Sequence, residues 1–598
     1  MEVFVSRAVP RSRRILALVA GAAALAAPLA LAAPANGAEA ETAAGAYTVT
    51  PLRFTVEAGG RTCAVDADLY RPAGVDAAHP APAVLATNGF GGSKSDGSTD
   101  AIGKAFAERG YVGLVYSGLG FGKSGCLISL DDPEIDGRAA ARLVDFLAGV
   151  RPADDGTRAD FVVRDGAGDP RVGMIGGSYG GAVQLAAASV DPRVDALVPL
   201  ITWNDLAYSL APNAADRATP GVFKWQWANG FYLMGEGQPL LSPSLDPSRI
   251  NSLGCLHFVT NACDTVRLLN SGRYPAAETE KMLAFARSVS PVSYLDRVKA
   301  PTLLVQGQTD SLFNLNEARA TYDRLRQRGV DTRMIWQSWG HSGGQKPGEL
   351  DLGQGNLETS YVGQRVLAWF DRHLRKDPAA DTGPAFAWYR EGQSGYGTAA
   401  RVPALSQKLY LSGDGKLVDN RTKVSRGSRQ YTNWLFPTSH SESSLAGMIG
   451  LPDPRPYDTA GTYLGWSSAP LAAPVDLVGA PKATLKVVSP RTERVQDSGD
   501  AADKLVLFAK LYDVAPDGGK TLVNRLVAPV RVPDVTRPFT VELPGIVHRY
   551  ETGHRLEFVI AASDSAYFGN RGVKPVIVTS APEDTGTLEL PLVAGRVG

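Results

Sequence analysis

The chain has no net charge and lacks the common sequence motifs that bind nucleotides or catalytic metals. Lys plus Arg and Asp plus Glu each number 61 in 598 residues, so the charge balance does not favour nucleic acid or an anionic membrane as a partner. The sequence lacks a G-x-x-x-x-G-K-[ST] loop, an H-E-x-x-H pair and paired C-x-x-C motifs. We therefore expect no cofactor, no metal and no nucleic-acid partner.

Long apolar runs are also scarce, and the one at the N-terminus has the features of an export signal. Four arginines between Arg7 and Arg14 precede the Ala/Leu run Ile15–Ala33, and small residues suited to cleavage follow at Ala33–Ala35 or Ala38–Ala40. We expect residues 1–40 to be removed after Sec or twin-arginine export, leaving a secreted protein with no stable membrane association. An uncleaved anchor is the competing interpretation.

Cysteine is rare, and its even number suits an exported chain with disulfides. The four cysteines are Cys63, Cys126, Cys255 and Cys263. Cys255 and Cys263 bracket a short segment and suggest one pair, which would leave Cys63 with Cys126. Three connectivities are possible and the sequence does not choose between them; four buried thiols are the alternative.

Ser178 lies in a G-x-S-x-G motif whose flanks match a nucleophile elbow. Val172–Ile175 reads as a short buried strand before the motif, and Ala182–Ala188 supplies helix formers after it. A strained strand–turn–helix junction of this kind lifts a serine hydroxyl above a sheet edge. The alternative is an ordinary Gly-rich loop between a strand and a helix.

A serine nucleophile needs a histidine and a carboxylate, and elimination points to His341 and Asp310. Of seven histidines, His79 precedes the serine, contrary to the Ser–Asp–His chain order of α/β-hydrolases. His341 follows the expected strand Thr332–Trp336, and Asp310 ends the apolar run that starts at residue 300. The remaining histidines fall in a helix, in an irregular segment or in the β-rich tail: His257, His373, His440, His548 and His554.

The oxyanion of an acyl-transfer intermediate needs two N–H donors. One is expected from Tyr179, which follows the nucleophile. The other is expected from the Gly-rich loop after the strand Ala83–Thr87; we choose Phe90, with Gly89 and Gly91 as the alternatives.

Several motifs resemble one known family. The tyrosine after Ser178, the glycine-rich loop Tyr116–Gly125, the acid segment Pro291–Leu295 and the tail motifs in 550–570 are similar to the X-prolyl dipeptidyl-peptidase and cocaine-esterase-like serine hydrolases. The resemblance implies an α/β-hydrolase fold with a helical cap, followed by an all-β jelly-roll sandwich domain. It also implies that the β domain is non-catalytic and buttresses the active site.

The chain pattern fits three segments after this resemblance. Residues 1–40 form the signal, residues 41–378 the α/β catalytic domain and residues 379–598 the β-sandwich, with a linker at 377–384. Strand–helix alternation fails between about residues 204 and 290, where we place the cap.

The cap carries aromatic residues that we predict to bind substrate, namely Trp203, Tyr208, Trp225 and Trp227. Packing within the cap's own core is the alternative. A dipeptidyl-peptidase also needs an acid for the substrate's amine; candidates are Asp205, Glu236, Asp246 and Asp264. We favour a secreted X-Pro dipeptidyl-peptidase-like serine hydrolase acting on a peptide, over an acyl esterase acting on a small ester. A non-catalytic binding protein is the third possibility.

Overall fold

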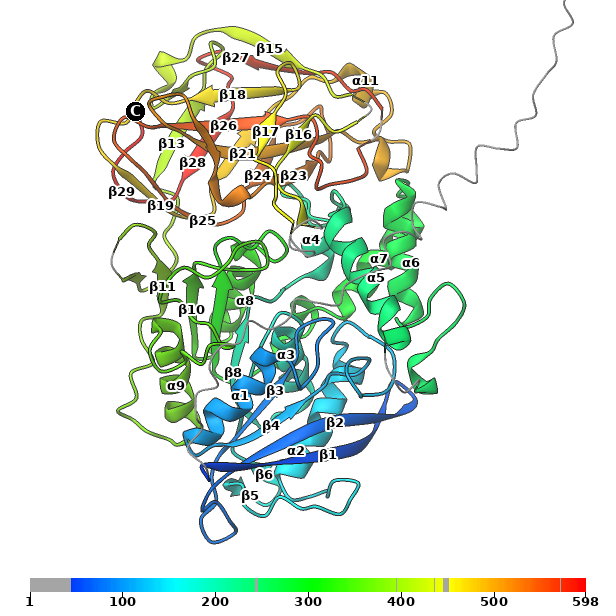
Figure 1. Ribbon diagram of the computed structural model, residues 1–598. Helices are drawn as coiled ribbons and strands as arrows, with labels where there is room; N and C mark the ends of the chain where they lie inside the picture. The colour runs from blue at the N-terminus through cyan, green and yellow to red at the C-terminus, as the bar shows by residue number, and fades with distance from the viewer. Residues whose placement is uncertain (1–44, 242–245, 394, 435, 445–450, 571) are drawn as a thin grey trace, which may run out of the picture.

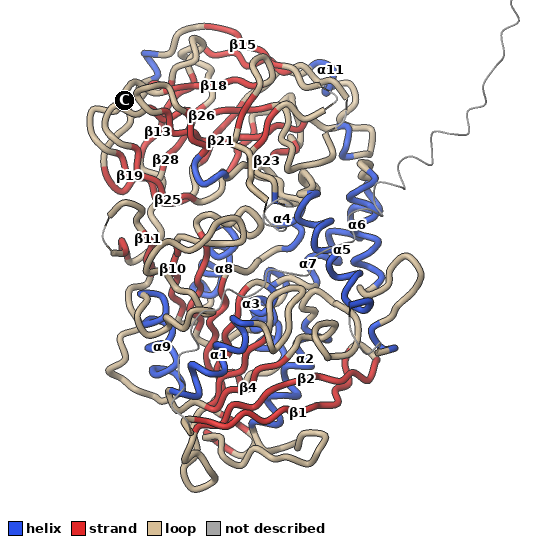
Figure 2. The backbone as a smooth tube through the Cα atoms, in the orientation of Figure 1, coloured by secondary structure: helices blue, strands red, loops and turns tan. Residues whose placement is uncertain are grey.

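A computed structural model describes residues 45–598 apart from 242–245, 394, 435, 445–450 and 571. The expected signal peptide lies outside the described residues. An α/β part and a β-rich part sit one above the other, and a group of helices lies along their common side (Figures 1 and 2).

The α/β part is built on one ten-stranded sheet with the order β1-β2-β4-β3-β7-β8-β9-β10-β11-β12. Its seven central strands, from β4 to β11, are parallel, while β1, β2 and β12 pair antiparallel at the two edges. The strands are β1 Tyr47–Ala58, β2 Arg61–Pro72, β3 Ala83–Thr87, β4 Val112–Tyr116, β7 Val172–Gly177, β8 Val194–Leu200, β9 Thr302–Gly307, β10 Thr332–Gln337, β11 Phe386–Tyr389 and β12 Tyr396–Ala399. The short hairpin β5 Arg164–Gly166 and β6 Asp169–Pro170 lies outside this sheet.

Helices cover both faces of the sheet, which explains why its central strands are buried and mostly apolar. Every residue of β3, β4 and β9 is buried. The helices α1 Gly97–Glu108 and α9 Tyr361–Leu374 pack in one apolar cluster, and α2 Arg138–Leu147 and α3 Tyr179–Val190 pack in another on the opposite face. The helix α8 Leu315–Gln327 completes this second layer.

The expected interruption of the alternation is a helical cap. It contains α4 Leu206–Leu210, α5 Trp225–Leu241, α6 Thr260–Ser271 and α7 Ala276–Ser288, all inserted between β8 and β9. The last three stand side by side at the edge of the molecule (Figure 1). Because β8 and β9 are adjacent parallel strands, this insertion rises from the sheet edge at which their carboxyl ends meet.

The C-terminal part is a β-rich domain of antiparallel sheets. One five-stranded sheet has the order β14-β13-β28-β20-β24; another runs β18-β26-β21-β22, with β23 paired to β21. Their inner faces share one core, whose members include Leu409, Trp466, Leu507 and Phe558. The jelly-roll topology itself stays a prediction. The strands are β13 Gln407–Leu411, β14 Leu417–Val418, β15 Gly427–Tyr431, β16 Ser439–His440, β17 Tyr457–Asp458, β18 Tyr463–Ser467, β19 Val475–Gly479, β20 Lys482–Leu485, β21 Val506–Val514, β22 Lys520–Leu522, β23 Ala528–Arg531, β24 Phe539–Glu542, β25 Ile546–Tyr550, β26 Arg555–Ala561, β27 Val576–Ser580, β28 Thr587–Leu590 and β29 Leu592–Ala594; a short helix, α11, spans Pro490–Glu493.

The expected boundary after residue 378 falls inside the α/β sheet. β11 and β12 follow the 377–384 segment, yet β11 pairs in parallel with β10 of the hydrolase sheet. The segment 377–384 has the composition of a linker between domains. No local pattern shows that the strand after it pairs with β10.

Two disulfides join the four cysteines, Cys63 to Cys126 and Cys255 to Cys263. The first ties β2 to the loop after β4, and the second closes the segment before α6. Across the described ranges, no helix combines the length and the apolar character needed to cross a bilayer.

Candidate active site

Ser178 stands at a sharp turn between β7 and α3. Its backbone has φ 55° and ψ −117°, outside the regions that side-chain-bearing residues favour. The neighbouring glycines allow the turn to lie close to β3, since a Cβ on Gly180 would come within 2.4 Å of the Thr87 carbonyl oxygen. The strand, elbow and helix expected around the G-x-S-x-G motif are therefore all present.

Three side chains far apart in the sequence meet at the carboxyl edge of the sheet. His341 Nε2 lies 2.9 Å from Ser178 Oγ, and His341 Nδ1 lies 2.7 Å from Asp310 Oδ2. Asp310 is fully buried, and its Oδ1 accepts a 2.7 Å hydrogen bond from the Phe313 amide. This arrangement fixes the imidazole so that its second nitrogen faces the serine hydroxyl.

Two aromatic rings hold the imidazole from the sides. Phe313 and Trp227 meet it edge-on, with ring centroids 5.1 Å and 6.1 Å away and interplanar angles of 86°. The histidine side chain is 12% exposed, so bulk water has limited access to it.

The two amides predicted to bind the oxyanion are free to donate. Within the part of the chain that the structure describes, neither the Tyr179 N–H nor the Phe90 N–H has a hydrogen-bond acceptor in the protein. The Gly-rich loop approaches the nucleophile closely, because a Cβ on Gly89 would lie 4.0 Å from Ser178 Cβ. The choice between Phe90 and its glycine neighbours stays a prediction.

An apolar cavity of about 110 Å³ opens beside Ser178 beneath the cap. Its lining includes Phe90, Leu130, Trp203, Leu312 and Phe313 from the hydrolase loops, and Leu206, Leu210, Phe231, Val266, Leu269, Met282 and Phe285 from the cap helices. Among the described residues, no Asp, Glu, Lys, Arg or His side chain lines it. The cavity is thus suited to an uncharged, apolar group bound next to the nucleophile.

Of the four aromatics predicted to bind substrate, Trp203 lines this cavity and the other three do not. Tyr208 is stacked under Arg217 at 4.1 Å, while the Trp225 indole donates to the Ser565 carbonyl of the β-rich domain. Trp227 packs against His341 and points its N–H towards Ser311. The prediction of a pocket position was wrong for Tyr208, Trp225 and Trp227, because these side chains pack the cap against its neighbours.

None of the four candidate amine anchors lines the cavity either. Asp205 caps α4 and lies 3.6 Å from Arg287 Nε, and Asp246 accepts hydrogen bonds from Ser248. Glu236 accepts from two backbone amides, and Asp264 pairs with Arg267 on the surface. Each carboxylate has a structural partner of its own.

Family models match both parts of the chain. The X-Pro dipeptidyl-peptidase (S15 family) model covers residues 60–343, and the X-Pro dipeptidyl-peptidase C-terminal non-catalytic domain covers residues 380–574. The chain belongs to the X-Pro dipeptidyl-peptidase and cocaine-esterase-like family. Membership of this family supports a serine hydrolase rather than a non-catalytic binding protein.

Curated relatives carry an esterase name. The "Putative serine esterase" of Mycobacterium bovis is 23% identical over 326 residues, which cover 47% of this chain and 48% of the relative. A protein of the same name from Mycobacterium tuberculosis matches equally. The match therefore spans about half the length of these relatives.

Several solved structures share the fold over nearly the whole chain. An α-amino acid ester hydrolase aligns with a TM-score of 0.62 at 18% identity, covering 95% of this chain and 100% of that one. An aminopeptidase from a marine sediment Thaumarchaeota archaeon aligns with a TM-score of 0.61 at 16% identity, covering 94% and 99%. A CocE/NonD family hydrolase from Staphylococcus aureus gives 0.57 at 13% identity, covering 91% and 97%. These likenesses establish the fold of the family member, and its substrate has to be argued from its own residues.

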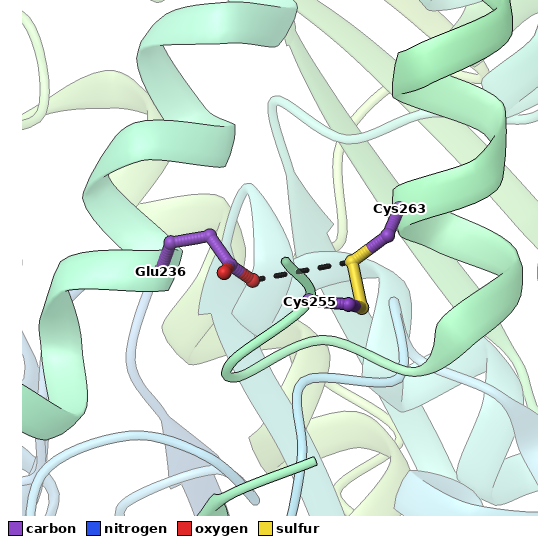
Figure 3. A group of neighbouring side chains, drawn as sticks. All are labelled: Glu236, Cys255 and Cys263. Carbon is purple, nitrogen blue, oxygen red and sulfur yellow. Dashed lines mark hydrogen bonds between the residues drawn. A yellow bond between two sulfur atoms is a disulfide. The ribbon is translucent and has the colours of Figure 1, made fainter. Parts of the chain in front are cut away.

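A second group of side chains in this family member consists of Glu236 on α5 and the Cys255–Cys263 disulfide, which it faces. Figure 3 shows Glu236 beside the joined Cys255 and Cys263. Both Glu236 oxygens accept backbone hydrogen bonds, from Leu256 and His257, and the sulfurs are bonded to each other. We interpret this group as a staple of the segment that leads into α6.

The polar residues behind the triad were not predicted from the sequence. Ser311 and Ser342 directly follow Asp310 and His341 and are bonded to each other. Glu442 of the β-rich domain binds Ser311 across 131 positions of sequence, and Lys224 binds the Ser311 carbonyl. The two serines could have been found from the sequence, because each directly follows a predicted catalytic residue. No local pattern marks Glu442 or Lys224.

Proposed function

We propose that this family member is an exported esterase that hydrolyses carboxylic esters with an apolar acyl group. The observation that carries the proposal is the cavity beside Ser178, whose lining holds no charged side chain. A dipeptidyl-peptidase has to hold the protonated amine of its substrate, and burying an ammonium without a partner costs several kcal/mol. An acyl chain would instead gain about 0.8 kcal/mol per buried CH₂.

In the proposed mechanism, Ser178 is the nucleophile and His341 its general base. His341 Nε2 takes the hydroxyl proton as Oγ attacks the ester carbonyl, and Asp310 stabilises the resulting imidazolium. The amides of Tyr179 and Phe90 bind the oxyanion, and the imidazolium then protonates the leaving alcohol. Water, deprotonated by the same nitrogen, releases the acid from the acyl-enzyme.

Export is part of the proposal because of the cysteines. Both disulfides are buried in the catalytic part, and such bonds persist in oxidising compartments rather than in the cytosol. The basic and apolar N-terminal sequence is of the kind that directs a chain there.

A comparison of two substrate classes tests the assignment. We expect turnover of p-nitrophenyl acetate, butyrate and octanoate, with little cleavage of Gly-Pro and Ala-Pro anilides. The X-Pro peptidase remains the second candidate because the family model carries that description. If the anilides were cleaved with a kcat/KM similar to that of the esters, the X-Pro peptidase would be the function and the esterase proposal would be overturned.

Two substitutions test the three assigned roles. Ser178→Ala removes the nucleophile and should abolish labelling by a fluorophosphonate. Asp310→Asn keeps the shape but would donate to His341 Nδ1, so Nε2 would carry the proton and could no longer accept one; kcat should fall by roughly 10⁴-fold. Thermal unfolding midpoints show whether each variant is folded. Asp310→Asn activity within about tenfold of the parent would exclude this role.

A further inference from the structure

Glu442 is a side chain of the C-terminal domain that reaches the catalytic loops of the hydrolase. It follows β16, it is 5% exposed, and its two carboxylate oxygens both lie 2.6 Å from Ser311 Oγ. Ser311 is the residue after Asp310. A carboxylate of the domain described as non-catalytic is therefore separated from the catalytic acid by one serine.

The same serine joins the loop of the acid to the loop of the base. Ser311 N donates to Ser342 Oγ at 3.2 Å, and the two hydroxyls share a further short hydrogen bond. Ser342 is the residue after His341. Glu442 thus anchors a pair of serines that couples the positions of Asp310 and His341.

A buried lysine completes the cluster. Lys224 is 4% exposed, and its Nζ donates to the carbonyls of Ser311 at 2.6 Å and Leu312 at 3.0 Å. Burial lowers the pKa of Lys224 to about 8, while the charge of Glu442 acts in the opposite direction. Lys224 therefore binds the backbone of the loop that follows Asp310, while Glu442 binds the Ser311 side chain of the same loop.

Glu442 also helps to hold the aromatic wall of the imidazole. Trp227 Nε1 lies 3.3 Å from Glu442 Oε1 and 3.2 Å from Ser311 Oγ. The Trp227 ring meets His341 edge-on. One carboxylate therefore contacts both the serine beside the acid and the tryptophan beside the base.

We propose that Glu442 is a positioning residue of the hydrolase, acting through Ser311, Ser342 and Trp227 on Asp310 and His341. This proposal rests on the proposed catalytic roles of Ser178, Asp310 and His341. The effect is sensitive because misplacing catalytic groups by about 1 Å costs up to roughly 10²-fold in rate. The C-terminal domain then contributes to the active site without touching substrate.

Glu442→Ala and Glu442→Gln test the proposal. Alanine removes both contacts, so kcat for p-nitrophenyl butyrate should fall by roughly 10- to 100-fold while KM changes less than about twofold. Glutamine keeps an acceptor of the same shape and should restore kcat to within about fivefold. The rate constant for fluorophosphonate labelling should fall in parallel, because it reports the reactivity of Ser178 without depending on the ester.

Glu557→Ala is the matched control. Glu557 is a glutamate of the same domain, 6% exposed, and its carboxylate pairs with Lys520 instead of with a catalytic loop. Glu557→Ala should lower the midpoint of thermal unfolding and leave kcat unchanged at temperatures where the protein is folded. Glu442→Ala with parental kcat and labelling rate, or with losses that Glu557→Ala reproduces, would overturn the proposal. Absence of ester turnover and labelling in the parent would instead overturn the proposed function.

Discussion

At the residue scale, His341 is held between a buried carboxylate and a serine hydroxyl, at 2.7 Å and 2.9 Å. This geometry allows one nitrogen to accept and return a proton in each half of an acyl transfer. Each member had a local signal in the sequence: a G-x-S-x-G motif, the end of a buried strand, and a loop after the next strand. These local signals are why the three residues could be predicted from the sequence.

Two buried aspartates behind the nucleophile had no such signal. Asp131 and Asp136 are 0% and 3% exposed, and the Asp131 amide donates to the Tyr179 hydroxyl. Burial raises the pKa of Asp136 to about 7, and the charge of Asp132 adds to this. Burial, with the charge of Asp136, raises the pKa of Asp131 well above its usual range.

Asp136→Asn should reduce the pH dependence of stability. The folded pKa of Asp136 exceeds its unfolded value of about 4, so the folded state binds more protons between these values. The free energy of unfolding must therefore fall as the pH rises from about 4 to about 7, by on the order of 2–4 kcal/mol from this group. Asparagine can still accept from the Ser129 hydroxyl, which now bonds Asp136.

Guanidinium unfolding at about pH 5 and about pH 8.5 measures this difference. The parent should lose more stability between the two conditions than Asp136→Asn. Asp264→Asn, at a carboxylate 57% exposed, is the control and should behave as the parent. Identical losses in all three proteins would show that Asp136 is ionised in the folded state at both pH values.

At the scale of elements, the cap helices form one wall of the cavity beside Ser178. α7 has local signals in the sequence, namely its helix formers and the flanking Pro275. The side of the cap on which each aromatic packs was not predictable. Cap residues are buried against the sheet, the other cap helices and the β-rich domain, so they show no single apolar face.

Met282 on α7 should control acyl-chain length. It is 6% exposed, lines the cavity beside Ser178 and also lines the outer groove between α6 and α7. Met282→Trp should fill the cavity, lowering kcat/KM for p-nitrophenyl octanoate by roughly tenfold or more while acetate changes less than about twofold. Met282→Ala should open the wall and raise the octanoate-to-acetate ratio.

Lys281→Ala is the control on the same helix. Lys281 lines the outer groove but does not line the cavity, so the chain-length profile should match the parent. Equal losses for acetate and octanoate in Met282→Trp would mean that the acyl group binds elsewhere.

At the scale of the whole molecule, the two parts are connected through the cap. The Ala214 amide donates to Pro529 of β23, and Phe223 forms a bridge with Phe568. The sequence predicted both parts and their order, but these contacts join positions more than 300 residues apart and had no local pattern. The pairing of β11 with β10 also had no local pattern, and it extends the hydrolase sheet past the expected domain boundary.

Arg531 of β23 is a fully buried connection between the cap and the C-terminal domain, and its removal should uncouple the two parts. Its guanidinium is fully buried, donates to the carbonyls of Pro220, Gly221, Ala501 and Gly569, and lies 5.1 Å over the ring of Tyr274 in the cap. Burial lowers its pKa to about 10, so the charge persists at neutral pH and is compensated chiefly by carbonyl dipoles. Arg531→Ala leaves the carbonyls of Pro220, Gly221 and Gly569 without this donor, at about 1–3 kcal/mol for each buried group, while the Ala501 carbonyl keeps the Lys504 amide.

We expect Arg531→Ala to lower the free energy of unfolding by roughly 3 kcal/mol or more and to separate calorimetric unfolding into two transitions. Arg537→Ala, at an arginine in the same domain that is 82% exposed, should leave a profile like that of the parent. The cap helices line the cavity beside Ser178. Loosening the attachment of the cap should therefore also raise KM for p-nitrophenyl butyrate more than it lowers kcat. A stable Arg531→Ala protein with one parental transition would show that the other hydrogen bonds and the apolar contacts are enough to hold the cap to the C-terminal domain.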